Sequence, residues 1–126
     1  MKLSNLSGLR FFLLFLLLAG GGCNQASKPP APLPLEQLPA ALDKAYSKAA
    51  PDTKDLAVAV SAAVQSQDYS KAYVGLQSLL GKSGLTREQA DVTTRGMLSV
   101  HDALQAAQAK GDAAAAQTLE VQRRDK

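Results

Sequence analysis

Residues 69–80 read YSKAYVGLQSLL, and this stretch decides the fold. Its apolar side chains recur at intervals of three and four residues, which is the period of one face of an α-helix; they are Tyr69, Ala72, Tyr73, Leu76, Leu79 and Leu80. Asp68 stands directly before the stretch and is the expected N-cap of this helix. Gly75 in mid-helix costs up to about 1 kcal/mol relative to alanine, so we expect it to allow close approach of a neighbouring helix.

The same helical period continues on both sides of this stretch, and no part of the chain has the alternation of a β-strand. Capping residues, prolines and glycines set the expected helix ends. The expected helices are one that starts at Pro39 and is closed by Pro51, one capped by Asp52 or Thr53, one over 69–80, one over 86–110 and one from 112 to about 123. The sequence therefore predicts an all-α fold, a small antiparallel bundle of about four or five helices arranged as stacked hairpins.

The connection between the second and third expected helices is very short. Gln67 and Asp68 leave room only for adjacent helices, so these two should form an antiparallel hairpin. The second helix is rich in alanine where the third carries tyrosine and leucine, so small side chains should face large ones. The longest helix, 86–110, should lie across both, and Thr86 with Gln89 predicts a capping box at its start.

The N-terminal residues have the pattern of an export signal. Lys2 and Arg10 precede an unbroken apolar run over 11–19, which is too short to span a bilayer. Three glycines and Cys23, the single cysteine of the chain, follow. This arrangement resembles the signal of bacterial lipoproteins, with residues 19–23 as the lipobox. The alternative is an ordinary secretory signal, because Gly20 and Gly22 also satisfy a small-x-small cleavage rule.

The lipoprotein resemblance implies a lipid anchor and three parts of the chain. Cleavage would fall between Gly22 and Cys23, and Cys23 would carry the lipid. The parts are a signal peptide over 1–22, the lipidated cysteine with a Pro-rich tether over 23–38, and a helical domain over 39–126. Asn24 follows the cysteine, where an aspartate would retain such proteins at the inner membrane of enteric-type envelopes. We therefore expect export and anchoring to the periplasmic face of the outer membrane.

Composition argues against several classes of function. Without Lys2 and Arg10, 12 basic residues face 11 acidic ones, and a net charge of +1 gives no electrostatic footprint for nucleic acid. His101 is the single histidine and lies at the edge of an apolar stripe, so no metal site is expected. No serine stands in the setting of a nucleophile, and Cys23 is used by the lipid. We expect no enzyme activity, no cofactor and no metal.

The three tyrosines of the chain are the candidate partner-binding residues: Tyr46, Tyr69 and Tyr73. Their helical spacing favours the core, but one that stays exposed in a groove would anchor a partner protein or peptide. Residues 67–80 also resemble the turn and second helix of a tetratricopeptide repeat, which implies helical hairpins. The sequence predicts a scaffold or interaction module. The alternative is a structural lipoprotein attached to peptidoglycan through its C-terminal Lys126.

Overall fold

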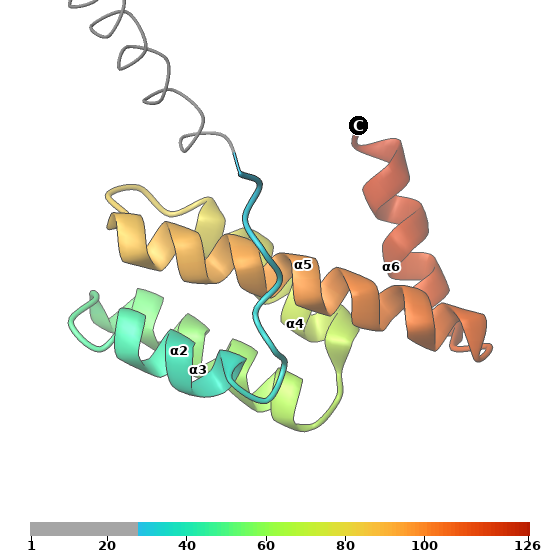
Figure 1. Ribbon diagram of the computed structural model, residues 1–126, viewed down its shortest axis with the longest axis horizontal. Helices are drawn as coiled ribbons and strands as arrows, with labels where there is room; N and C mark the ends of the chain where they lie inside the picture. Colours follow the sequence, from blue (N-terminus) through green and yellow to red (C-terminus); the bar gives the residue numbers. More distant parts are fainter. Residues whose placement is uncertain (1–27) are drawn as a thin grey trace, which may run out of the picture.

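The computed structural model describes residues 28–126, which form helices joined by short turns (Figure 1). Within this range there are five helices and no strand: α2 (Leu38–Ala45), α3 (Pro51–Gln65), α4 (Tyr69–Leu80), α5 (Arg87–Ala109) and α6 (Ala113–Arg124). The predicted all-α fold is confirmed. The expected signal peptide, its cleavage site at Gly22 and Cys23, and the tether up to residue 27 lie outside the described residues. None of the described helices is long and apolar enough to cross a membrane.

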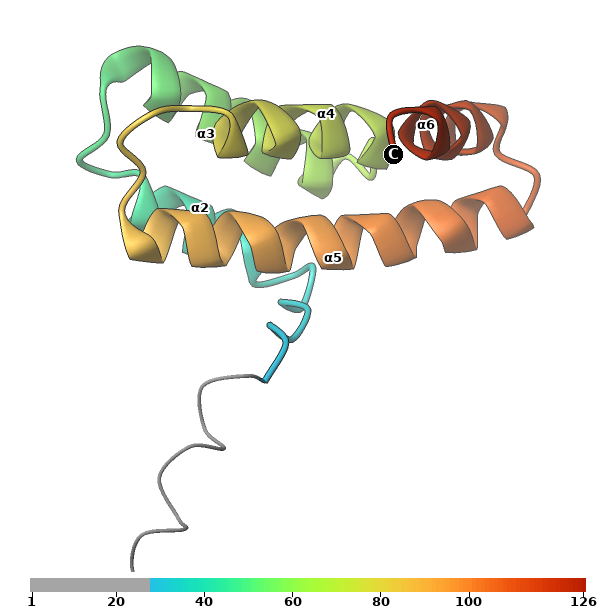
Figure 2. The ribbon, with the colours of Figure 1, turned by 90° about the horizontal axis from the view of Figure 1, so that it is seen from above.

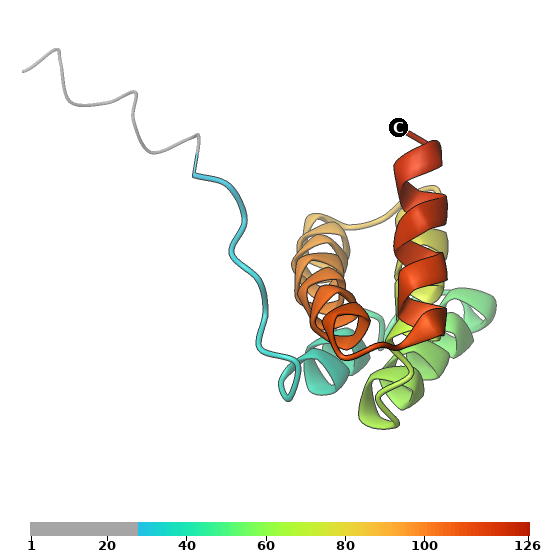
Figure 3. The same ribbon diagram turned by 90° about the vertical axis from the view of Figure 1, so that its right-hand side faces the viewer.

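Helices α2 to α5 run in alternating directions and form a closed ring of four. Each packs on two others: α3 lies against α2 and α4, and α5 lies against α4 and α2 (Figure 2). Helix α6 crosses steeply at the end of the bundle, where it contacts α5 and α4 (Figure 3). The expected hairpin of α3 and α4 is confirmed. The expectation that the longest helix also lies across α3 was wrong, because α2 occupies that side of α5.

Two glycines set the distance between neighbouring helices. A Cβ atom added at Gly75 would stand 2.5 Å from Cγ2 of Val60, so α3 and α4 are as close as a glycine permits. This confirms the expected role of Gly75. A Cβ atom at Gly96 would stand 2.7 Å from Cδ1 of Leu38, so α2 and α5 are also as close as a glycine permits. These close approaches help to seal the apolar core, which is centred on Leu38, Leu42, Tyr46, Val60, Leu76, Leu79, Val100 and Leu104.

The helix starts follow capping chemistry at most positions. The Asp68 carboxylate accepts from the Lys71 N–H at 3.1 Å, as predicted. Thr86 and Gln89 form the predicted capping box at 3.1 and 3.0 Å. The expected start of α3 was wrong: Ala50 is its N-cap and Pro51 its first residue. Proline is favoured at that position because its missing N–H needs no partner there and its fixed φ suits a helix.

The segment before α2 packs on the bundle. Leu33 is 8% exposed and belongs to the core. The Arg95 side chain donates from Nε to the carbonyl of Ala31 at 2.9 Å, and the Ser99 hydroxyl donates to the carbonyl of Leu33. These contacts hold the chain against α5 along residues 31–33, so it enters the bundle at a fixed point.

Candidate interaction groove

Two of the three tyrosines are core residues. Tyr46 is 1% and Tyr73 is 4% exposed. The Tyr46 hydroxyl lies 2.7 Å from Oγ1 of Thr93, and the Tyr73 hydroxyl accepts from the Gln122 amide. Burial raises the pKa of both phenols above the ordinary value of 10.0, because the charged form would lose its hydration. Neither ring is available to a partner.

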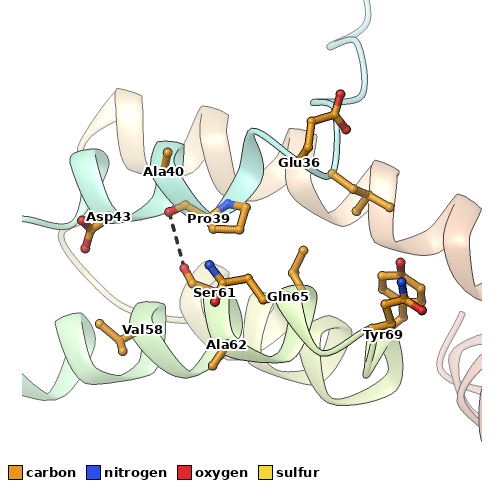
Figure 4. Close-up of a pocket in the computed structure, with 12 residues that line it drawn as sticks. Glu36, Pro39, Ala40, Asp43, Val58, Ser61, Ala62, Gln65 and Tyr69 are labelled. Atoms are coloured by element: carbon orange, nitrogen blue, oxygen red, sulfur yellow. Dashed lines mark hydrogen bonds between the residues drawn. The ribbon is translucent and has the colours of Figure 1, made fainter.

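Tyr69 is the one tyrosine that reaches the surface. It is half-buried at the start of α4 and lines a groove of about 650 Å³ between α2 and α3 (Figure 4). Figure 4 shows Tyr69 at one end of the groove and Asp43 at the other. Small and aliphatic side chains form much of the remaining lining, among them Pro39, Ala40, Val58 and Ala62. Val58 is 52% exposed, which is high for a valine in the middle of a helix.

The turn between α3 and α4 fixes the position of Tyr69. The N–H of Asp68 donates to the carbonyl of Ala63 at 2.9 Å, and the N–H of Gln67 donates to the carbonyl of Val64 at 3.1 Å. This pair of bonds is a Schellman motif, which requires a left-handed residue after the helix end. Gln67 takes that conformation with φ of 60°. Asp68 then caps α4 at once, so the Tyr69 ring lies beside the end of α3.

The same turn occurs again between α5 and α6. There the N–H of Asp112 donates to the carbonyl of Ala107 at 3.1 Å, and Asp112 caps α6 through the Ala115 N–H. The left-handed residue is Gly111, with φ of 90°. The chain thus uses glycine at one turn and Gln67 at the other, although glutamine is strained there. The Gln67 side chain lines the groove, and strained residues often occur at functional sites.

Gln67→Gly is expected to raise the free energy of unfolding. Glycine relieves about 1–2 kcal/mol of strain from the left-handed backbone conformation. It also raises the conformational entropy of the unfolded chain, which costs about 0.4–1 kcal/mol of stability. The net gain in the free energy of unfolding is therefore about 0.5–1 kcal/mol. Urea denaturation followed by circular dichroism measures it. Gly111→Ala at the matching turn is the control and should destabilise. A loss of stability in Gln67→Gly would show that its side chain contributes more than the backbone strain costs.

The groove is lined by a few polar residues as well as apolar ones. The Ser61 hydroxyl donates to the carbonyl of Ala57 on its own helix at 3.1 Å and lies 3.5 Å from the carbonyl of Pro39 on α2. Glu36 and Asp43 are the charged residues that line the groove. Within residues 28–126, no three His, Cys, Asp or Glu side chains gather as a metal site would require. His101 lies elsewhere, with its ring centroid 6.5 Å from that of Tyr73.

The sequence pointed to Tyr69 only as one of three tyrosines, and the rest of the groove was missed. Val58, Ala62 and Gln65 follow one another at helical spacing on the outer face of α3, opposite its buried stripe. That second stripe was the available signal. The contribution of α2 had no such signal, because its packing beside α3 depends on contacts distant in sequence. No family model, no curated protein and no solved structure matches this chain.

Proposed function

We propose that this protein is a lipid-anchored cell-envelope protein, without enzymatic activity, whose helical domain binds a protein or peptide in the α2–α3 groove. One observation supports the binding role: Tyr69, the one tyrosine of three that reaches the surface, lines this groove together with the exposed Val58. Tyrosine is enriched among residues that dominate binding energy, because it offers a large rigid ring with a polar tip.

The shape of the groove supports a segment of polypeptide as the occupant. Two helices form its walls, and small side chains between them let another backbone approach. Grooves of this kind accept amphipathic helices or extended peptides in many interaction domains. The groove lining lacks a nucleophile paired with a base, which favours binding over catalysis.

Tyr69→Ala is expected to weaken partner capture about tenfold or more, as loss of an aromatic anchor does. A photo-crosslinking residue placed at Gln65 would report capture in native membranes, and the same residue at the exposed Asp102 on α5 is the control. We expect a discrete adduct from position 65 that disappears with Tyr69→Ala, and none from position 102. The helical circular dichroism and melting temperature should change little, because Tyr69 is half-buried. Equal adducts with and without Tyr69 would contradict the binding role.

Cys23→Ser is expected to abolish fatty-acid incorporation and to release the protein from the membrane fraction. The support is the resemblance of residues 19–23 to a lipobox. Two or three acyl chains anchor a protein stably, whereas one binds marginally. Metabolic labelling and fractionation measure the outcome, with recovery in the outer membrane expected for the unchanged protein. Labelling that survives the substitution would contradict the anchor, and release of the unchanged protein would favour the secretory signal.

A further inference from the structure

The charged residues that line the groove are all acidic. Glu36 and Asp43 belong to its lining, and no lysine, arginine or histidine does. Both carboxylates are exposed. The ion pairs among residues 28–126 use other carboxylates, namely those of Asp52, Asp91 and Glu120. The groove therefore presents two carboxylates that take part in none of these ion pairs.

The two carboxylates lie on the same side of the groove. Glu36 stands in the turn that leads into α2, and Asp43 follows seven residues later on α2 itself. Glu36 precedes the first residue of α2 by two positions, so the two carboxylates follow the same wall of the groove. Figure 4 shows Glu36 and Asp43 on the α2 side and Val58, Ala62 and Tyr69 on the opposite side. The groove thus has one acidic edge and one apolar edge.

We infer that the occupant is a basic amphipathic helix, an inference that rests on the proposed binding function of the groove. Its aliphatic face contacts Val58, Ala62 and Tyr69. Lysines or arginines two turns apart along one edge of that face pair with Glu36 and Asp43. Complementary charge of this kind fixes the orientation of a partner and selects against acidic ones.

A helix fits these features better than an extended strand. In a helix, side chains seven residues apart lie on one face, so two basic residues match the spacing of the two carboxylates. An extended peptide would need other positions, because its rise per residue is more than twice as large. The wall also offers side chains from Pro39, Ala40 and Ala62, and such small residues allow the large side chains of a packed helix to fit between them.

Three synthetic peptides test the inference against the full chain in neutral detergent. Each has about 18 residues, enough to populate a helix, and carries the same leucine and alanine stripe. Two edge positions seven residues apart are lysine in the first, glutamine in the second and glutamate in the third. Fluorescence anisotropy measures their dissociation constants. We expect the lysine peptide to bind about fivefold tighter than the glutamine peptide, and the glutamate peptide to bind most weakly. High salt should remove the differences.

Variants of the protein place the effect in the groove. Glu36→Gln with Asp43→Asn should weaken the lysine peptide about fivefold and leave the glutamine peptide unchanged. Glu88→Gln with Asp102→Asn removes the same charge from exposed positions on α5, so it is the matched control. It should leave all three affinities unchanged. Circular dichroism of both double variants checks that the fold is intact.

The outcomes separate this inference from the proposed function. If the three peptides bind equally and Tyr69→Ala weakens all of them, the groove remains a binding site, but the inference of a basic partner is overturned. Preference for the glutamate peptide would also overturn it. Equal loss of the lysine peptide in both double variants would attribute the preference to overall charge and overturn the assignment to Glu36 and Asp43. If no peptide binds, the basic helix is overturned, whereas the proposed function depends on the adduct at position 65.

Discussion

Leu76→Ala is expected to lower the free energy of unfolding by about 2–4 kcal/mol. Leu76 is 0% exposed and lies in the middle of α4, the helix that packs on α3, α5 and α6. The small alanine side chain would leave a cavity that the surrounding side chains cannot fill completely. A domain of this size has a total stability of about 5 kcal/mol, so about 1–3 kcal/mol would remain and the variant should unfold at a clearly lower temperature and urea concentration.

Leu80→Ala provides the matched control for this effect. It makes the same chemical change on the same helix, but Leu80 is 37% exposed and its removal leaves no closed cavity. We expect a loss below about 1 kcal/mol. Urea and thermal denaturation followed by circular dichroism measure both variants. Equal losses in the two would mean that α4 is not the centre of the core, and an unchanged Leu76→Ala would mean that its face is free for binding.

The features that the sequence predicted correctly depend on residues close together in the chain. The bounds of α4 follow from one apolar stripe and the cap at Asp68, and the start of α5 follows from the box formed by Thr86 and Gln89. The repeated turns at Asp68 and Asp112 follow from the same local chemistry. Each of these signals acts within about one helical turn, so a single sequence contains all the information that it needs.

The features that were missed depend on contacts between distant residues. Helix α2 ends at Ala45, although the sequence predicted that it continues to Pro51. Tyr46 is its C-cap and extends the buried stripe of Leu38 and Leu42, and the Tyr46 hydroxyl contacts Thr93 of α5. The close approach of Leu38 to Gly96 joins residues 58 positions apart, and no local pattern indicates it. The groove depends on the direct packing of α2 on α3, where the Ser61 hydroxyl lies 3.5 Å from the carbonyl of Pro39. Sequence reasoning could therefore propose a tyrosine in a groove but not which helices form the walls.

The same limit applies to the choice among the tyrosines. Helical spacing treats Tyr46, Tyr69 and Tyr73 alike, since each falls on an apolar stripe. Tyr73 becomes buried where α6 crosses α4, and its hydroxyl meets Gln122 of α6. Tyr69 stays at the surface because it begins α4 immediately after the turn. Only the three-dimensional arrangement separates the two core rings from the one in the groove.

Tyr46→Ala is expected to cost about 3–5 kcal/mol, the range for loss of a buried aromatic ring. About 0–2 kcal/mol would then remain of a stability of about 5 kcal/mol, so up to about half of the molecules would be unfolded. The ring joins α2 to α5, and its hydroxyl meets Oγ1 of Thr93 at 2.7 Å. Thermal melts of Tyr46→Ala and Tyr69→Ala then give opposite results from the same substitution. The first should melt at a much lower temperature, and the second should melt near the unchanged protein while losing partner capture.

Tyr46→Phe separates the ring from the hydroxyl. It keeps the packing and removes one hydrogen bond, which is worth about 1 kcal/mol. Thr93 is not left unsatisfied, because its hydroxyl still donates to the carbonyl of Gln89 at 2.7 Å. We therefore expect Tyr46→Phe to fold, to melt at a slightly lower temperature and to bind the partner as the unchanged protein does. If Tyr46→Phe were as unstable as Tyr46→Ala, the hydrogen bond rather than the ring would hold α2 on α5. Stable folding of Tyr46→Ala with loss of capture would instead move the binding site from the Tyr69 groove to the side of α2 that faces α5.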